Sequence, residues 1–230
     1  MTSDNSIPVL TIDGPSGSGK GTIARNVARE LGWHLLDSGA LYRLVGLLAV
    51  RAGVAENDEP AIADLAANMI VRFDTDDRNQ ERIWLNSEDV TGDIRTEEGG
   101  RMASKVALLP AVRQALIGLQ KDLRQLPGLV ADGRDMGTRI FPDAGLKVFL
   151  TATTEERAKR RYKQLKDKGI DVSLPALARD IEDRDRRDSE RSIAPLRPAD
   201  DARVLDSSKL TIDEVTQMVL AWARERAGNV

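Results

Sequence analysis

A glycine-rich segment between a predicted strand and a predicted helix places the strongest constraint on this chain. The segment Gly14-Pro15-Ser16-Gly17-Ser18-Gly19-Lys20-Gly21-Thr22 follows the apolar run Ile7–Ile12 and precedes apolar residues at helical spacing from Ile23 to Leu31. Glycines allow backbone N–H groups to converge on phosphate oxygens, and the helix N-terminus adds a partial positive charge. Lys20 is placed to reach the β- and γ-phosphates of a nucleotide. The segment therefore predicts a phosphate-binding loop.

This loop departs from the common pattern G-x-x-x-x-G-K-[ST] at one position. Gly21 follows Lys20, and the hydroxyl comes one residue later, at Thr22. The shift leaves open whether Thr22 contacts Mg²⁺ directly or through water. A plain Gly-rich turn is the alternative, but the flanking strand and helix and the lysine argue against it. The spacing excludes a dinucleotide-binding loop, because no glycine follows Gly17-Ser18-Gly19 three residues on.

Further apolar runs alternate with helical patterns along the chain. Four of them predict strands in addition to Ile7–Ile12: Trp33–Leu36, Leu129–Ala131, Leu146–Leu150 and Ala202–Leu205. Gly32 is expected to end the first helix, and Ser38 is expected to cap the second. A last amphipathic helix runs from Ile212 to Trp222. This alternation predicts an α/β fold with a five-stranded parallel sheet flanked by helices.

About 90 residues separate the second predicted strand from the third, which is too many for a simple crossover of roughly a dozen. The stretch must therefore carry its own structure. Within it, Val71–Asp74 and Glu81–Leu85 flank the polar stretch Thr75–Gln80 and predict a hairpin with a longer loop. An inserted lobe is the simplest account. The chain length of 230 residues fits one enlarged domain of this kind, given roughly 150 residues per domain.

Composition excludes several classes of protein. The chain has no Cys and one His, which excludes disulfide frameworks, thiolate zinc sites and multi-histidine metal sites, so any metal must be a hard ion on oxygen ligands. The single His34 lies in an apolar run and is expected to be a packed strand residue. A net charge of −3 and 3% aromatic residues argue against a nucleic-acid partner. With no apolar run near ~20 residues and no basic leader, we expect a cytoplasmic protein without a membrane partner.

Three other stretches accompany the phosphate loop. Asp37-Ser38-Gly39-Ala40-Leu41-Tyr42-Arg43 follows the second strand, Asp132-Gly133-Arg134-Asp135-Met136-Gly137-Thr138 follows the third, and Arg184 to Arg191 precedes Ala194-Pro195-Leu196. With these stretches the chain resembles the bacterial cytidylate kinases, nucleoside monophosphate kinases that transfer the γ-phosphoryl group of ATP to CMP or dCMP. The resemblance extends from about Val9 to the last helix.

The resemblance implies a P-loop NTPase-type fold with three parts in one chain. The core would comprise residues 7–55, 94–152 and 195–230, the inserted lobe that binds the nucleoside monophosphate about 56–93, and a short lid about 153–194. It also implies catalytic roles for Lys20, Arg134 and Arg191. The triphosphate of ATP would be bound by residues 14–22 together with Arg157 and Arg161, which are two of the candidate lid cations Arg157, Lys159, Arg160 and Arg161.

The acceptor site is likewise implied by the resemblance. The acceptor phosphate is assigned to Ser38, Arg43, Arg134 and Arg191, the cytosine base to Ser104, Arg113 and Asp135, and the ribose to Arg184 and Asp188. Planar Arg forks suit a phosphate dianion, and a carboxylate suits the N4 amine of cytosine. Arg184, Asp188 and Arg191 have the spacing i, i+4 and i+7, so a helix through them would present all three on one side. The alternative for this segment is a surface helix with i,i+4 ion pairs.

Mg²⁺ is expected to accompany ATP, held by Thr22 and, through water, by Asp132 at the end of the third strand. The acceptor is already anionic, so no general base is assigned. Other kinases remain as alternatives, with UMP, AMP or a small metabolite as acceptor; a cytosine preference would separate them. A guanine-nucleotide switch would need an Asn-Lys-x-Asp sequence, which does not occur. We expect a monomer with ATP and CMP or dCMP as its only partners.

Overall fold

The computed structural model describes residues 7–75, 81–167 and 169–227. These residues form two compact units. The first combines the chain up to Leu36 with the chain from Leu123 onward, and the second is the uninterrupted stretch Asp37–Asp122. The second unit contains the stretch 56–93 that the sequence predicts as an inserted lobe, but it is wider, because α2, α5 and α6 (bounds below) pack within it.

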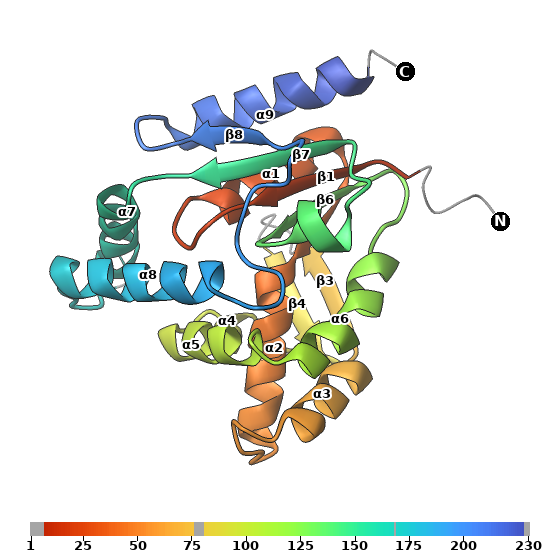
Figure 1. Cartoon of the computed structure of the whole chain (residues 1–230), viewed down its shortest axis with the longest axis vertical. Coiled ribbons are helices and arrows are strands. Elements are labelled where there is room, and N and C mark those ends of the chain that lie inside the picture. Colours follow the sequence, from red (N-terminus) through yellow and green to blue (C-terminus); the bar gives the residue numbers. More distant parts are fainter. Residues whose placement is uncertain (1–6, 76–80, 168, 228–230) are drawn as a thin grey trace. The chain divides into compact units, whose positions relative to one another are not determined.

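The first unit is an α/β structure (Figure 1). Its elements are β1 (Val9–Asp13), α1 (Lys20–Leu31), β2 (His34–Asp37), β6 (Leu129–Gly133), η2 (Met136–Ile140), β7 (Leu146–Thr151), α7 (Thr154–Lys166), α8 (Leu174–Ser189), β8 (Arg203–Asp206) and α9 (Ile212–Ala227). The strands form a five-stranded parallel sheet in the order β2-β6-β1-β7-β8. The predicted fold class is therefore confirmed.

One hydrophobic core joins the sheet to α1 and α9. The faces that meet there come from β1, β6, β7 and β8 on one side and from the two helices on the other, where Val27 of α1 and Val219 of α9 are fully buried. All five residues of β1 and of β6 are buried, as expected of parallel strands covered on both faces. The loops of the candidate site leave the sheet from the ends of these buried strands.

The second unit contains four helices beside α2 and a small sheet. Its elements are α2 (Ser38–Arg51), α3 (Glu59–Asn68), β3 (Val71–Thr75), β4 (Glu81–Leu85), β5 (Glu88–Asp89), α4 (Thr91–Ile94), α5 (Glu97–Val106) and α6 (Pro110–Asp122). β3 and β4 pair antiparallel with Val71 opposite Leu85, which confirms the predicted hairpin. Residues 76–80 of its predicted loop lie outside the described residues. The two-residue strand β5, which pairs with β4, has no pattern long enough to predict it.

The helix ends follow capping chemistry, with one correction. Gly32 ends α1 with φ of 65°, the left-handed conformation that favours glycine, as predicted. The prediction that Ser38 caps α2 is wrong by one residue. Asp37 is the cap, and its Oδ1 accepts a hydrogen bond from the N–H of Ala40 at 3.0 Å, while Ser38 is the first helical residue. Asp and Ser are equally good caps, so the pattern alone does not separate them.

No single helix of the described residues is long and apolar enough to cross a membrane. One sharply bent pair, Glu98–Val106 with Pro110–Asp122, meets the length and composition criteria for a broken span. Length and composition are the only grounds for that match.

Candidate active site

The candidate site of the first unit is built on one edge of its sheet. β1 pairs with β6 so that Asp13 lies opposite Gly133, and β7 pairs with β8 so that Thr151 lies opposite Asp206. In a parallel sheet the carboxyl ends of neighbouring strands lie together, and ligands bind there. The segments that follow β1, β6, β7 and β8 therefore start at neighbouring points.

The glycine-rich segment forms the connection between β1 and α1. Lys20 is the first residue of α1, and Gly19 caps the helix with φ of 92°. The Lys20 Nζ turns back over the loop and donates to the carbonyl of Pro15 at 3.4 Å. The Oγ of Ser18 is fully buried and has no hydrogen-bond partner among the described residues. A buried hydroxyl in that state marks a position where a ligand oxygen can bind.

Asp132 lies beside the start of α1. One of its carboxylate oxygens is 3.9 Å from Lys20 Nζ, and a Cβ added to Gly21 would lie 3.0 Å from the other. This close approach accounts for the glycine after Lys20, because a side chain there would press on the carboxylate. The hydroxyl of Thr22, on an exposed residue, and the Asp132 carboxylate are oxygen donors of the kind Mg²⁺ prefers. The described ranges hold no group of three or more His, Cys, Asp and Glu side chains suited to a metal.

A second charged cluster joins three of the residues assigned to the acceptor. Asp188, 1% exposed, accepts a hydrogen bond from Arg134 Nε at 2.9 Å and another from Arg191. Burial opposes ionisation of Asp188, but the charges of Arg134 and Arg191 outweigh it and hold the pKa of the carboxyl below its ordinary value. Two guanidinium groups thus share one buried carboxylate.

Arg184 and Asp188 lie on α8, but Arg191 does not. The expected helix through all three is wrong at its last residue, since α8 ends at Ser189 and Glu190 caps it. The carbonyl of Asp188 accepts from the N–H of Leu196 at 2.8 Å, so the chain has already left the helix. Arg191 reaches Asp188 from beyond the helix end.

The two lid arginines assigned to ATP differ in their surroundings. Arg157 of α7 is buried, and each of its guanidinium N–H groups has an acceptor among the described residues. Arg161, half-buried one turn later, contacts Gln164 through Nη1 at 3.2 Å. Burial lowers the pKa of Arg161. The contact of either residue with ATP stays a prediction.

The second unit carries four more of the residues assigned to the acceptor, while Asp135 is buried in the first unit. Ser38 is buried at the start of α2, and Arg43 of the same helix donates to the carbonyls of Ile94 at 2.7 Å and Thr96 at 3.0 Å. Ser104 on α5 and Arg113 on α6 are also buried. The guanidinium of Arg113 lies over the ring of Tyr42, 5.6 Å from its centre, and donates to the carbonyl of Ala107. Their roles toward a nucleotide stay predictions.

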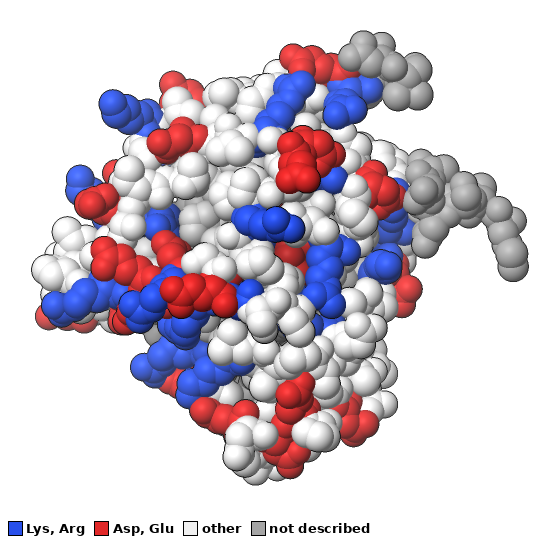
Figure 2. Space-filling model, viewed as in Figure 1, with Lys and Arg blue, Asp and Glu red and all other residues white. Residues whose placement is uncertain are grey.

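Three residues that sequence reasoning missed also hold this edge of the sheet. Buried Asp13 accepts the N–H groups of Met136 and Gly137, the residues that follow Asp135. Asp185 of α8 binds Arg157, and Ser207 receives hydrogen bonds from Arg160. Asp13 has a visible signal, a carboxylate at the end of a buried strand. Asp185 has none, because acidic and basic residues alternate along α8, as Figure 2 shows.

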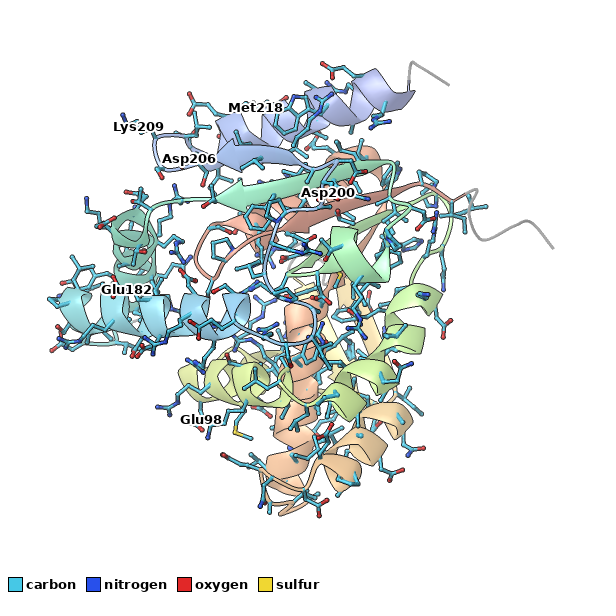
Figure 3. The ribbon with its side chains drawn as sticks, viewed as in Figure 1. Glu98, Glu182, Asp200, Asp206, Lys209 and Met218 are labelled. Atoms are coloured by element: carbon cyan, nitrogen blue, oxygen red, sulfur yellow. The ribbon has the colours of Figure 1, made fainter. Side chains whose placement is uncertain are left out.

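Ser207 lies in the turn between β8 and α9. Figure 3 labels Asp206, the last residue of β8, and Lys209, which lies within this turn. The Ser207 side chain contacts the carbonyls of Ser18 and Thr151 at 3.4 and 3.1 Å. The turn after the last strand of the sheet is thus attached to the phosphate loop.

The chain is similar to known proteins over nearly its whole length. A family model described as "Cytidylate kinase" matches residues 10–225. A cytidylate kinase of Methylococcus capsulatus is 60% identical over 217 residues, which cover 94% of this chain and 97% of that protein. One of Pseudomonas aeruginosa is 54% identical over 228 residues, 99% of this chain and 100% of that protein. The crystal structure of an uncharacterized protein from Eubacterium ventriosum shares the fold, with a TM-score of 0.50, 12% identity and coverage of 94% and 97%.

Proposed function

The chain belongs to the cytidylate kinase family, and we propose that it transfers the γ-phosphoryl group of ATP to CMP or dCMP, giving ADP and CDP or dCDP. The observation that carries this proposal is the cluster in which Arg134 and Arg191 share the Asp188 carboxylate, in the same unit as the phosphate loop. Two paired guanidinium groups form a site for a phosphate dianion, since their N–H forks match its oxygens.

The remaining assigned residues would bind the base and the ribose of CMP. Asp135 would accept from the cytosine N4 amine, while Arg113 and Ser104 would donate to its acceptors. Uracil presents an acceptor where Asp135 needs a donor, so a buried carboxylate would be left unpaired, and the site would reject UMP. Arg184 and Asp188 would bind the ribose.

The transfer step requires positioning and charge neutralisation more than covalent chemistry. The phosphate loop and Lys20 would bind the triphosphate, with Arg161 as the lid cation, while Arg43, Arg134 and Arg191 hold the acceptor phosphate in line. Mg²⁺, held by the oxygens of Thr22 and Asp132 directly or through water, would neutralise charge on the phosphates. Exclusion of water from these groups would favour transfer over ATP hydrolysis.

We expect the protein to act as a monomer in the cytoplasm, in pyrimidine nucleotide metabolism. Its near-balanced charge, 34 basic against 37 acidic residues, supports small-molecule substrates over nucleic acid.

The test is ADP release from ATP and Mg²⁺ with CMP, dCMP, UMP, AMP or GMP supplied separately, beside a control without acceptor. We expect CMP and dCMP to dominate. An Asp135→Asn variant should lose its preference for CMP over UMP. ADP release that is equal without an acceptor, or that needs another nucleotide, would overturn the assignment to CMP and leave only the phosphate loop.

A further inference from the structure

Every guanidinium N–H group of Arg157, on α7, donates to an acceptor within the protein. Its Nε donates to the carbonyl of Ala152 at 3.0 Å, one Nη to Ser16 O at 3.1 Å and to Asp185, and the other Nη to Thr154 and again to Asp185. An arginine has five N–H donors, so none is left over. A direct contact with ATP would require one of these bonds to break.

The first of these acceptors belongs to the phosphate loop. The carbonyl of Ser16 points at Arg157, and a Cβ added to Gly17, the next residue, would lie 3.2 Å from the Cβ of Arg157. The Ser16–Gly17 peptide bond is planar and trans, so the N–H of Gly17 points away from Arg157. An anion that accepts this N–H therefore polarises the same peptide group whose oxygen accepts from Arg157. Hydrogen bonds in such a chain strengthen one another.

The second acceptor belongs to α8. Both carboxylate oxygens of Asp185 receive hydrogen bonds from Arg157, which is the two-point geometry that fixes a pair most firmly. Three residues later the same helix presents Asp188 to Arg134 and Arg191. The end of α8 is thus linked through Arg157 to the phosphate loop and through Asp188 to the acceptor cluster.

We propose that Arg157 and Asp185 are positioning residues that couple a nucleotide in the phosphate loop to the cluster of Arg134, Asp188 and Arg191. A bound triphosphate strengthens the bond from Arg157 to Ser16, which holds Asp185 and with it the end of α8. Arg134 and Arg191 are then presented in one fixed arrangement to the acceptor. This inference rests on the proposed function in one respect only, which is that the acceptor is CMP.

The test compares Asp185→Asn with Asp183→Asn. Asp183 lies on the same helix and forms an exposed ion pair with Arg186, so its loss controls for a change of charge on α8. The measurement is the dissociation constant of CMP by calorimetry, with and without the non-hydrolysable ATP analogue AMP-PNP and Mg²⁺. In the unmodified chain and in Asp183→Asn the analogue should tighten CMP binding by a factor within about 5 to 150. In Asp185→Asn this factor should fall toward one.

A second variant and a second readout complete the test. Arg157→Lys keeps the positive charge but loses the planar guanidinium that makes two parallel hydrogen bonds to Asp185. It should therefore reduce the coupling factor as Asp185→Asn does. Without any CMP, AMP-PNP should slow amide hydrogen exchange in α8 of the unmodified chain and of Asp183→Asn, but not of Asp185→Asn. An unchanged coupling factor, or α8 protection that survives Asp185→Asn, would overturn the proposal. If CMP fails to bind the unmodified chain, the proposed function is wrong. The hydrogen-exchange measurement still tests whether a nucleotide in the phosphate loop protects α8 through Asp185.

Discussion

At the scale of single residues, Asp13 shows how one carboxylate fixes the segment that follows β6. It is buried at the end of β1 and accepts the N–H groups of Met136 at 2.9 Å and Gly137 at 2.8 Å. Burial raises the pKa of Asp13 to about 6, against the opposing effect of these two N–H groups. The same side chain therefore anchors the turn beside Asp135 and titrates in the weakly acid range.

This pKa predicts a pH-dependent contribution to stability. Between pH 3.8 and about 6 the folded protein keeps a proton on Asp13 that the unfolded chain has released. The contribution of Asp13 to the free energy of unfolding is therefore largest below pH 3.8 and is lost as the pH rises through 6. From about pH 4 to 7, the free energy of unfolding of the unmodified chain should fall by about 2 kcal/mol relative to that of Asp13→Asn, measured by urea unfolding at each pH.

A control with the opposite sign is available. Asp201 has its pKa lowered by a hydrogen bond from Lys147, so it stabilises the fold above its ordinary pKa and loses that effect as the pH falls. Asp201→Asn should therefore be less stable than the unmodified chain at pH 7, and that difference should shrink in acid. If the free energy of unfolding of Asp13→Asn depended on pH in the same way as that of the unmodified chain, the raised pKa of Asp13 would be contradicted.

At the scale of elements, α7 donates hydrogen bonds to backbone carbonyls of the phosphate loop. Arg160 donates to Ser18 O at 3.1 Å and to the hydroxyl and carbonyl of Ser207. Peptide carbonyls that face outward leave the opposite N–H groups facing into the loop. The helix thus fixes the loop shape that a phosphate needs before any ligand arrives.

Arg160→Gln should raise the KM for ATP about tenfold with a smaller change in kcat. The reason is that the bond from the charged Arg160 to the loop carbonyl of Ser18, worth ~1.5–3 kcal/mol, is lost while the groups assigned to catalysis stay in place. Steady-state kinetics at saturating CMP measures the effect. Lys163→Gln, an exposed position on the same helix, should match the unmodified chain. A KM for ATP equal to that of Lys163→Gln would remove Arg160 from this role.

Local patterns in the sequence predict the elements but not their neighbours. The five strands, the end of α1 at Gly32 and the hairpin follow from period, apolar runs and turn residues. The strand order does not, because β1 lies between β6 and β7, which are distant in sequence. Likewise, Arg157 looks like any lid cation among Arg and Lys residues. Two of its acceptors, Ser16 and Asp185, lie 141 residues before it and 28 residues after it, which no local pattern reveals.

At the scale of the whole molecule, the two units carry different shares of the assigned site. The residues assigned to ATP all belong to the first unit, whereas those assigned to CMP come from both, with Ser38, Arg43, Ser104 and Arg113 in the second. Ligands stabilise what they bind. CMP should therefore protect the second unit, and an ATP analogue alone should not.

Limited proteolysis tests this difference. At 100 times its dissociation constant, CMP should slow cleavage within Asp37–Asp122 by up to about 100-fold, when cleavage follows the population of the open form. AMP at the same concentration is the control and should have little effect. If AMP-PNP alone protects this stretch as well as CMP does, the assignment of the four second-unit residues to CMP is wrong.

The strand order also has a consequence for synthesis on the ribosome. Val9 of β1 pairs with Leu129 of β6, and Leu10 with Leu146 of β7, so this buried apolar strand has to wait for both partners to be translated. The second unit is one uninterrupted stretch, Asp37–Asp122, that emerges in the meantime. At about 5–20 residues per second, β1 stays unpaired for several seconds or more. We expect the nascent chain to fold from its middle outward, with an early segment that chaperones can recognise until the later strands arrive.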